Sequence, residues 1–460
     1  MQIKKYNFII WIALLLVCWV DFFIVFLYSL TTEQILMSFL PLVYIFAVTF
    51  SGAFKTWIDF SSPGFMIVNG MYFIKCVVYP FVNIISNTTY TTMNRDTLFA
   101  IILEIGEVVI IYLIFFLYNR FYPSRLENNK EYAAEQNHLD NGRFLVAWFF
   151  IFVVAIVLAF PSSLRAYHFF TVASLEIIYS GLSEASANGI AAWIIKLARY
   201  ILVAYACGWF FCKYNKTGKT RYWLGALVLV GFTVMIVYGV SRSDFVIPGL
   251  CGYFLLVRLF PRKARLISFS LIGLLAMVFV TFSLMRFEEM NSLRELSESL
   301  QAYFCCEKNM AIAILAKRRY FHEIDFQTML SDLLGNWAGI GRLFRQHYNI
   351  SEYFNFVYHG HQLAVDQIVP TVGQSYMQFG GFGVYLYTAI MTVFCLTMDK
   401  KYRESDKIEF SYLYLYATVK CAITLMGNFK IFSATAFNVL LPMFLLFWFN
   451  QKFAVKRRKR

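Results

Sequence analysis

The sequence predicts an all-α integral membrane protein with about twelve transmembrane helices. Of the 460 residues, 59% are apolar and only 15% are charged, and long apolar stretches recur along almost the whole chain. A soluble domain usually carries about 25% charged residues, and a bilayer core needs about 20 consecutive apolar residues per helix. Transmembrane β-strands are shorter and alternate apolar with polar residues, so these continuous stretches favour helices.

The predicted spans follow one another along a single membrane domain, 1–460. The first stretch, 8–30, is too long for the core of a signal peptide, so we expect it to remain as a helix. Further spans are expected at 35–54, 65–85, 98–118, 144–160, 191–212, 223–241, 244–260, 266–285, 376–397, 410–427 and 431–450. A large loop, 286–375, separates the ninth span from the tenth.

Lysine and arginine residues gather in alternate loops and near both ends of the chain. The net charge is +14, and the last five residues, Lys456–Arg460, are all basic. Short cytoplasmic loops are enriched in Lys and Arg, so we expect both termini to face the cytoplasm. Topology and contact with anionic lipid explain the basic tail better than nucleic-acid binding does. We therefore expect membrane lipid, and no nucleic acid, as a partner.

The loop 286–375 is expected to form a cap on the outer side of the membrane. Long connections without structure of their own are uncommon unless they are functional. Leu293–Leu315 and Met329–Arg345 have the apolar spacing of amphipathic helices. A cap of such helices would cover the outer mouth of the bundle. The sequence shows no inverted repeat, which many secondary transporters have.

A short polar turn, Gly239–Asp244, joins the seventh and eighth predicted spans. Ser243 or Asp244 can cap the start of the next helix. Arg242 would then lie beside the positive end of that helix, which is a combination suited to phosphate or pyrophosphate oxygens. An arginine that merely extends to the membrane interface is the alternative.

Further outer-side cations accompany the cap. Arg286 begins the loop, where pairing with Glu288 or Glu289 is the simpler interpretation. Arg342 and Arg345 are three residues apart, so on a helix they share a face. A negatively charged lipid carrier is a natural ligand for these positive charges, and a solvated loop face is the alternative.

Several charged residues fall inside predicted spans. They are Asp21, Lys75, Glu104, Glu107, Lys196, Arg199 and Lys420. Charges within a membrane are costly and usually functional or paired. Lys196 and Arg199 share a helix face near the outer end of the sixth span, where they could meet a diphosphate. Glu104 and Glu107 also share a face, and pairing among these groups is equally compatible with the sequence.

Two of the six histidines, His359 and His361, stand two residues apart just before the tenth span. Histidine is suited to proton transfer near neutral pH, so His361 or His359 is the candidate catalytic base, with Asp366 as the next candidate. A His-x-His pair can also bind a metal, but no third ligand is evident. We therefore expect neither a metal site nor a cofactor.

The segment that follows carries a family resemblance. Its residues Pro370, Gly373, Tyr376, Phe379, Gly380 and Gly383, with the twelve spans and the large outer loop, resemble the Wzy-type oligosaccharide repeat-unit (O-antigen) polymerases of bacteria. The turn Gly239–Arg242 resembles a Gly-x-x-Arg turn of that family, and His361 with Gln362 is similar to the His-Asn element of O-antigen ligases. Gln374 stands where an acidic residue is common, so no acid is carried over there.

The resemblance implies a GT-C-like, metal-independent glycosyltransferase of the bacterial inner membrane. It would transfer a growing glycan from undecaprenyl diphosphate to a new undecaprenyl-diphosphate-linked oligosaccharide at the periplasmic face, building O-antigen or capsular polysaccharide. Polymerases of this kind usually work with a chain-length regulator protein. The residues assigned to the diphosphate are Arg242, Arg286, Arg342, Arg345, Lys196 and Arg199. The residues assigned to sugar stacking are Tyr353, Phe354 and Tyr358.

Three alternatives remain open at this stage. A lipid-linked oligosaccharide flippase would have a similar number of spans, although the large outer loop counts against it. An O-antigen ligase shares the layout but uses a different acceptor. A structural membrane subunit would explain the helices, but not the outer-side Arg and His residues.

Overall fold

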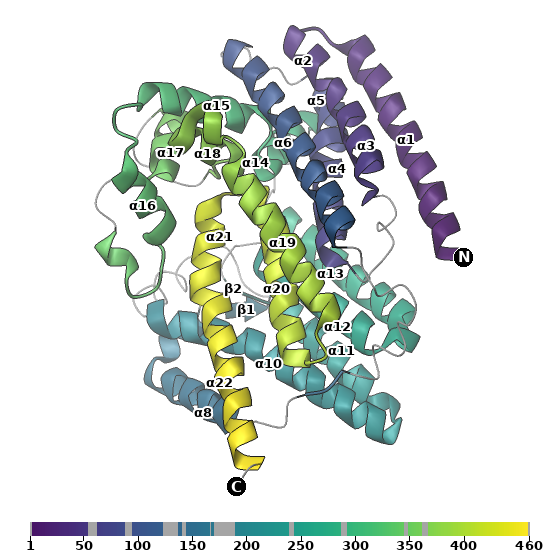
Figure 1. Cartoon of the computed structure of the whole chain (residues 1–460), viewed down its shortest axis with the longest axis vertical. Coiled ribbons are helices and arrows are strands. Elements are labelled where there is room, and N and C mark those ends of the chain that lie inside the picture. Colours follow the sequence, from purple (N-terminus) through teal and green to yellow (C-terminus); the bar gives the residue numbers. More distant parts are fainter. Residues whose placement is uncertain are drawn as a thin grey trace. The chain divides into compact units, whose positions relative to one another are not determined.

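The computed structural model describes residues 2–53, 62–87, 94–122, 137–139, 144–165, 167–169, 189–238, 243–286, 292–344, 348–360 and 367–458 (Figure 1). Most of these residues lie in helices, and the single sheet among them has two short strands. The chain divides into two compact units. Unit 1 contains 1–124, 289–397 and 420–437, and unit 2 contains 125–288, 398–419 and 438–460.

The helices confirm an all-α, multi-pass membrane protein. Within the described residues, six helices are long and apolar enough to cross a membrane, or up to eight if each of two bent pairs is one span. One bent pair turns by 113° at Pro261, and the other turns by 110° between Gly383 and Leu386. All twelve predicted stretches are helical over most of their length. The number of crossings, however, stays a prediction.

Unit 1 begins with the first four predicted spans and continues with the cap. Its N-terminal helices are α1 (Gln2–Tyr28), α2 (Thr32–Met37), α3 (Phe39–Ser51), α4 (Pro63–Phe73), the π-helical turn η2 (Ile74–Val78), α5 (Tyr79–Ile85) and α6 (Asn94–Phe121). The cap and the segment after it supply α14 (Leu293–Phe304), α15 (Glu307–Arg319), α16 (Phe326–Leu334), η5 (Gly341–Leu343), α17 (Ile350–His359), α18 (Thr371–Phe379), η6 (Gly380–Gly383) and the first part of α19 (Leu386–Glu404). The end of α20 (Ile408–Thr424) and α21 (Phe429–Thr435) complete the unit.

Large aromatic side chains and a few polar groups form the core of unit 1. Tyr44, Tyr72 and Tyr112 are almost fully buried in one cluster. The Tyr44 hydroxyl donates to the backbone carbonyl of Asn69 at 3.1 Å, and the Tyr112 hydroxyl donates to Asn69 Oδ1 at 2.7 Å. These bonds satisfy polar groups that would be costly to bury alone.

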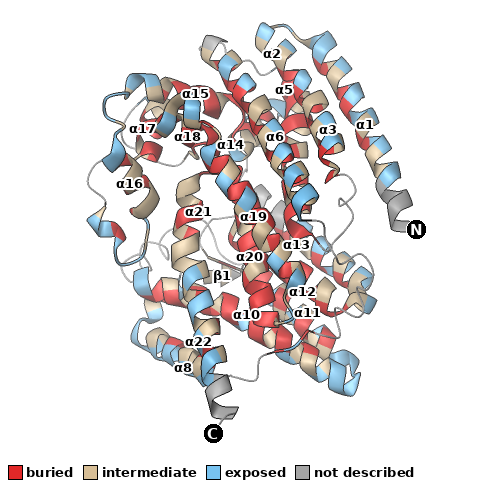
Figure 2. Cartoon of the chain, in the orientation of Figure 1, coloured by how far each residue is buried: buried red, intermediate tan, exposed pale blue. Residues whose placement is uncertain are grey.

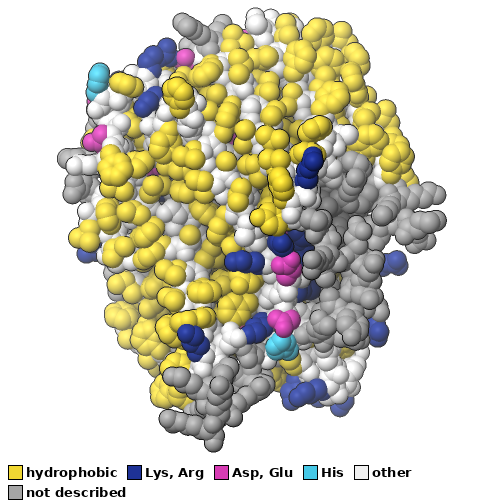
Figure 3. All heavy atoms as spheres, viewed as in Figure 1, with side chains coloured by type: hydrophobic (Ala, Val, Ile, Leu, Met, Phe, Trp, Pro, Cys, Tyr) yellow, Lys and Arg dark blue, Asp and Glu magenta, His cyan; other side chains and the backbone are white. Residues whose placement is uncertain are grey.

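Helix α1 differs from this buried core, because many of its apolar side chains are exposed. Leu16, Val20 and Leu27 are more than half exposed, and Figure 2 shows the same contrast between α1 and the buried faces of α5 and α6. Hydrophobic side chains also cover much of the face seen in Figure 3. Such surfaces suit a lipid solvent rather than water.

The cap segment is helical, as predicted, but it is divided differently. A break at Cys305, which has a positive φ of 49°, separates α14 from α15 within the stretch expected as one helix. The second expected helix ends at Leu334, because the chain turns at Gly335 and again near Gly339, where φ is 86°. Helix α17 was not predicted. A reciprocal capping box between Asn349 and Glu352 starts it.

Unit 2 is built from helices and the small sheet. Its elements are α8 (Phe144–Ala159), η3 (Pro161–Leu164), β1 (Tyr167–Phe169), α10 (Gly189–Thr217), α11 (Thr220–Met235), β2 (Ile236–Tyr238), α12 (Ser243–Leu259), η4 (Pro261–Lys263), α13 (Ala264–Arg286), the end of α19, most of α20, most of the π-helical turn η7 (Ala436–Leu440) and α22 (Leu441–Arg458). The strands pair antiparallel, with Tyr167 opposite Tyr238. This pair brings the end of α11 beside the segment that follows η3, which the sequence did not indicate.

Candidate functional site

Several predicted site residues cannot be placed. Those outside the described residues are Arg242, Arg345, His361 and Asp366. Arg286 is the last residue of α13, but its side chain is outside the described part of the chain. The functions assigned to these five residues stay predictions.

Two other predicted residues, both in the cap, are described. Arg342 lies on η5 and is exposed. His359 is the last residue of α17, and its ring centroid lies 5.0 Å from that of Tyr358. Gly360, with a positive φ of 73°, ends the helix directly after it. His359 therefore stands where α17 gives way to the segment that contains His361.

The aromatic residues predicted to stack on sugars have unequal access to solvent. Tyr353 and Phe354 are buried among the apolar residues that join α15 to α17. Tyr358 is only partly buried, and the Lys308 ammonium lies 5.2 Å from its ring centroid. In this arrangement Tyr358 is the most accessible of the three. Sugar stacking by these rings stays a prediction.

Unit 2 brings two cations, Lys196 and Arg199, to the carboxylate of Asp244. We call these three residues the cation cluster of unit 2. Lys196 Nζ lies 2.6 Å from Asp244 Oδ1, and Arg199 Nη1 lies 3.3 Å from Asp244 Oδ2. Arg199 Nη2 also donates to the carbonyl of Ile236 at 2.8 Å. The backbone N–H of Tyr238 donates to Asp244 Oδ2 at 3.1 Å. The sequence predicted that Lys196 and Arg199 share a face, but not that Asp244 joins them.

This cluster has one more positive than negative charge. Two cations share a single carboxylate, so the three side chains sum to +1. Arg199 is only 10% exposed, whereas the Lys196 side chain is 34% exposed. Asp244 is the second residue of α12, so the cluster also stands at the positive end of that helix. Excess positive charge at a helix N-terminus is suited to a phosphate or diphosphate.

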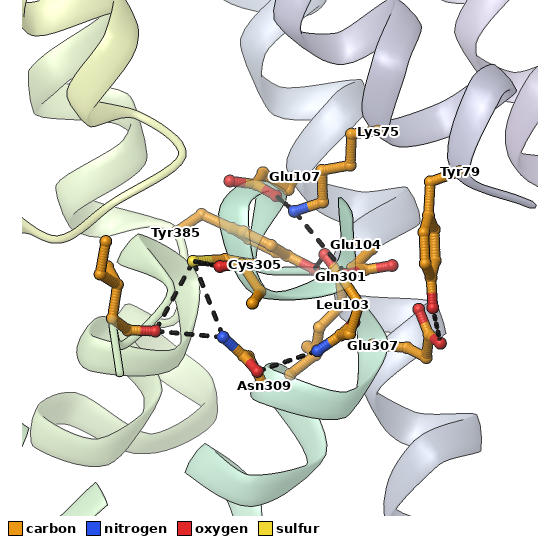
Figure 4. Close-up of polar contacts among 12 residues, drawn as sticks. Lys75, Tyr79, Leu103, Glu104, Glu107, Gln301, Cys305, Glu307, Asn309 and Tyr385 are labelled. Carbon is orange, nitrogen blue, oxygen red and sulfur yellow. Dashed lines mark hydrogen bonds and ion pairs between the residues drawn. The ribbon is translucent and has the colours of Figure 1, made fainter. Parts of the chain in front are cut away.

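Unit 1 holds a second group of charges, which we call the buried ion cluster: Lys75, Glu104, Glu107 and Glu307 (Figure 4). Lys75 Nζ lies 2.9 Å from Glu107 Oε2 and 3.7 Å from Glu104 Oε1. Lys75 is on η2, and π-helical turns are frequent at functional sites. Glu104 and Glu107 project from the same face of α6. The sequence singled out these three residues, and the fold pairs them.

Glu307 is the member that sequence reasoning missed. It is the first residue of α15, it is 1% exposed, and its Oε1 accepts a hydrogen bond from the Tyr79 hydroxyl. Burial raises the pKa of Glu307 to about 7, while the Tyr79 hydroxyl and the Lys75 ammonium act in the opposite direction. An acidic residue in the first turn of a helix usually faces solvent, so its position in the sequence gave little reason to expect burial.

Two amide side chains form a separate polar network near the buried ion cluster in Figure 4. Gln301 Nε2 donates to Asn309 Oδ1 at 2.9 Å, and Asn309 Nδ2 donates to the Ile368 carbonyl at 3.3 Å. These bonds link α14, α15 and the segment before α18, and Figure 4 shows the bond between Gln301 and Asn309. Among the described residues, no three His, Cys, Asp or Glu side chains gather as they would around a metal ion.

A third polar contact involves the segment that carries the family resemblance. Asp332 on α16 is fully buried, and its Oδ2 accepts from the side-chain amides of Gln374 and, at 3.4 Å, Gln378. Lys430 Nζ lies 3.9 Å from Asp332 Oδ1. Burial raises the pKa of Asp332 to about 6, against the effects of Lys430 and Gln374. Position 374 is a glutamine in this sequence rather than an acid, but the carboxylate of Asp332 in the cap lies against it.

We expect Asp332→Leu to destabilise unit 1 by about 2–4 kcal/mol, because the buried Gln374 amide and the partly buried Gln378 amide lose their acceptor and Lys430 loses its partner. Asp332→Asn keeps an acceptor oxygen and is the matched control, for which we expect less than half of that loss. Thermal unfolding of the detergent-solubilised protein, followed by fluorescence-detected size exclusion, measures both. Equal melting temperatures for Asp332→Leu and wild type would show that these bonds contribute little.

The fold and these paired intramembrane charges define a multi-pass helical membrane protein with buried polar sites in each of its two units. No protein-family model, curated protein or solved structure matches the chain.

Proposed function

We propose that the chain is a GT-C-like glycosyltransferase with about twelve spans in the bacterial inner membrane. It would polymerise undecaprenyl-diphosphate-linked oligosaccharide repeat units into O-antigen or capsular polysaccharide at the periplasmic face. Both termini would lie in the cytoplasm, and a chain-length regulator protein would be a partner. The proposal combines the resemblance of the segment Pro370–Gly383 with the chemistry of the described residues.

The cation cluster of unit 2 is the observation that carries the proposal. The polymerase reaction breaks the bond between a sugar and a diphosphate, and negative charge grows on the diphosphate as it leaves. Preorganised cations at that point stabilise the transition state. Lys196 and Arg199 carry a net positive charge at the start of α12, and Arg242 directly precedes that helix.

Proton transfer completes the proposed reaction. The acceptor hydroxyl must lose its proton as it attacks the sugar carbon, so a general base is required. His361 is the first candidate, with His359 and Asp366 as the others. His359 ends α17 beside the partly buried Tyr358, and a sugar ring stacked on that tyrosine would lie near it. Arg342 is exposed on η5 and remains a candidate phosphate ligand.

A lipid-linked oligosaccharide flippase is the second candidate, and one observation favours it. The buried ion cluster places carboxylates and a lysine inside helices that could span the membrane. Such groups often mark ion or proton pathways in transporters. The extensive helical cap, α14–α17, is the feature that a flippase does not require.

Surface glycan from a strain that lacks the gene distinguishes these functions. For a polymerase we expect the gel ladder to collapse to glycan with a single repeat unit, because ligation continues without polymerisation. Complementation with the wild-type gene should restore the ladder. Complete loss of surface glycan would point instead to a flippase or an O-antigen ligase, and an unchanged ladder would contradict all three.

A further inference from the structure

The buried ion cluster of unit 1 has more acidic than basic groups. With every group ionised, one lysine and three glutamates sum to −2, and all four residues are at most 4% exposed. Lys75 and Glu107 form the close pair, at 2.9 Å. Lys75 also lies 3.7 Å from Glu104 Oε1, so a single lysine serves the carboxylates of this cluster. Two like charges in an apolar site are unfavourable, so one of them is expected to be neutralised.

The hydrogen bonds around these two carboxyls are also incomplete. Among the described residues, Glu104 Oε1, Glu307 Oε2 and Gln301 Oε1 accept no hydrogen bond, and their residues are 3%, 1% and 2% exposed. All three atoms are acceptors, so none of them can donate a hydrogen bond to another. A proton on one carboxyl converts an acceptor into a donor and removes one negative charge at the same time.

The surroundings of Glu307 disfavour a metal cation. The N-terminus of α15 is positive, and Glu307 is its first residue. The Tyr79 hydroxyl already donates to Glu307 Oε1, and Asn83 Nδ2 lies 3.3 Å from that hydroxyl. These groups and the Lys75 ammonium stabilise the Glu307 carboxylate, and their positive charge would repel a bound metal cation.

We propose that the buried ion cluster is a proton-binding site, in which Glu104 and Glu307 hold one proton between them while Glu107 stays ionised against Lys75. Two carboxyls that share a proton are a known way to place like charges close together. The raised pKa of Glu307, about 7, agrees with this assignment. Lys75, Tyr79 and Lys308 also act on Glu307, and Glu104 and Cys306 interact electrostatically with it.

Proton binding at this site would couple the cap to pH. Glu307 begins α15, whereas Lys75 and the other two glutamates belong to η2 and α6. Loss of the proton at higher pH leaves like charges between α15 and α6, so the packing of α15 becomes less stable as the pH rises. This proposal does not depend on the glycosyltransferase activity, and a polymerase, a ligase or a flippase could each contain such a site.

Infrared difference spectroscopy of the full chain in lipid nanodiscs tests the proposal. The carbonyl stretch of a protonated carboxyl should disappear when the pH is raised from about 6 to about 8.5, a range that includes the value for Glu307. Glu104→Gln and Glu307→Gln should each reduce this band. Glu298→Gln, on an exposed part of α14, should leave it unchanged. The same band in wild type and in both cluster variants would overturn the proposal.

Mapping of carbodiimide adducts on the wild-type chain provides a second test that needs no variant. Dicyclohexylcarbodiimide enters apolar sites and adds to protonated carboxyls to give stable N-acylureas. We expect adducts on Glu104 or Glu307 that decrease as the pH rises. Asp332, equally buried and with a raised pKa, is the internal positive control. An adduct on Asp332 but on neither cluster residue would contradict the proposal, as would labelling suppressed by sodium but not by choline, which would indicate a sodium site.

Discussion

Lys75→Met is expected to prevent stable folding of unit 1. The substitution leaves Glu104 and Glu107 buried on α6 without their cation, since Lys75 Nζ lies 3.7 Å and 2.9 Å from their carboxylates. Breaking a buried ion pair by removing one partner typically costs about 3–5 kcal/mol, which is a large part of the stability of a folded domain. We expect little monodisperse protein in fluorescence-detected size exclusion, and a much lower melting temperature for what remains.

Two further variants distinguish the effect of losing the ion pair on stability from the effect of losing a long side chain. Lys75→Met combined with Glu107→Gln removes both members of the close pair and should recover part of the lost stability. Arg294→Met removes a cation whose side chain is 71% exposed, and we expect a change below about 0.5 kcal/mol. If Lys75→Met melts at the wild-type temperature, or if the double variant is no better than the single one, the pairing does not stabilise the unit.

The buried charges show how far the sequence could predict the site. Lys75, Glu104 and Glu107 stood out because a charge in an apolar stretch is costly and needs a partner. Their spacing also showed that the two glutamates share a helix face. Which cation pairs with them could not be predicted, because the pairing depends on how α4–α5 packs against α6. The fold class, in contrast, followed directly from the length and composition of the apolar stretches.

Glu307 escaped prediction for a local reason. The break before α15 occurs at Cys305, which adopts a left-handed conformation with a φ of 49°. Glycine or asparagine usually marks such a position, so the sequence read as one continuous amphipathic helix. On that helix a glutamate would be expected on the solvated face. Because of the break, Glu307 is the first residue of a new helix, and its side chain points into the core.

Unit 2 shows a similar limit. Asp244 was recognised as a candidate helix cap, and Lys196 and Arg199 as neighbours on one face. The pairing of β1 with β2 involves only three residues in each strand, which is too short a pattern to recognise in an apolar sequence. The fold brings Asp244 to the two cations, so that a residue predicted as a helix cap and two residues predicted to share a helix face form one cluster.

Lys196→Gln is expected to eliminate long-chain glycan without unfolding the protein. Arg199 keeps its contact with Asp244 at 3.3 Å in this variant, so no buried carboxylate is left alone. The neutral side chain can no longer stabilise charge on a departing diphosphate. Loss of one such group typically lowers a rate about 100-fold or more. The surface-glycan ladder of the complemented deletion strain should therefore shift to one or a few repeat units, with a normal amount of protein in the membrane.

Lys213→Gln is the matched control, because Lys213 lies on the same helix, α10, but is exposed and contacts Trp209 rather than an acid. We expect its ladder to equal that of wild type. Arg199→Gln is less informative, since Arg199 also donates to the Ile236 carbonyl and its loss would disturb the fold. A full ladder from Lys196→Gln would remove Lys196 from the diphosphate site. The excess positive charge of unit 2 would then be a structural feature, and the case for a polymerase would rest on the cap and the segment Pro370–Gly383.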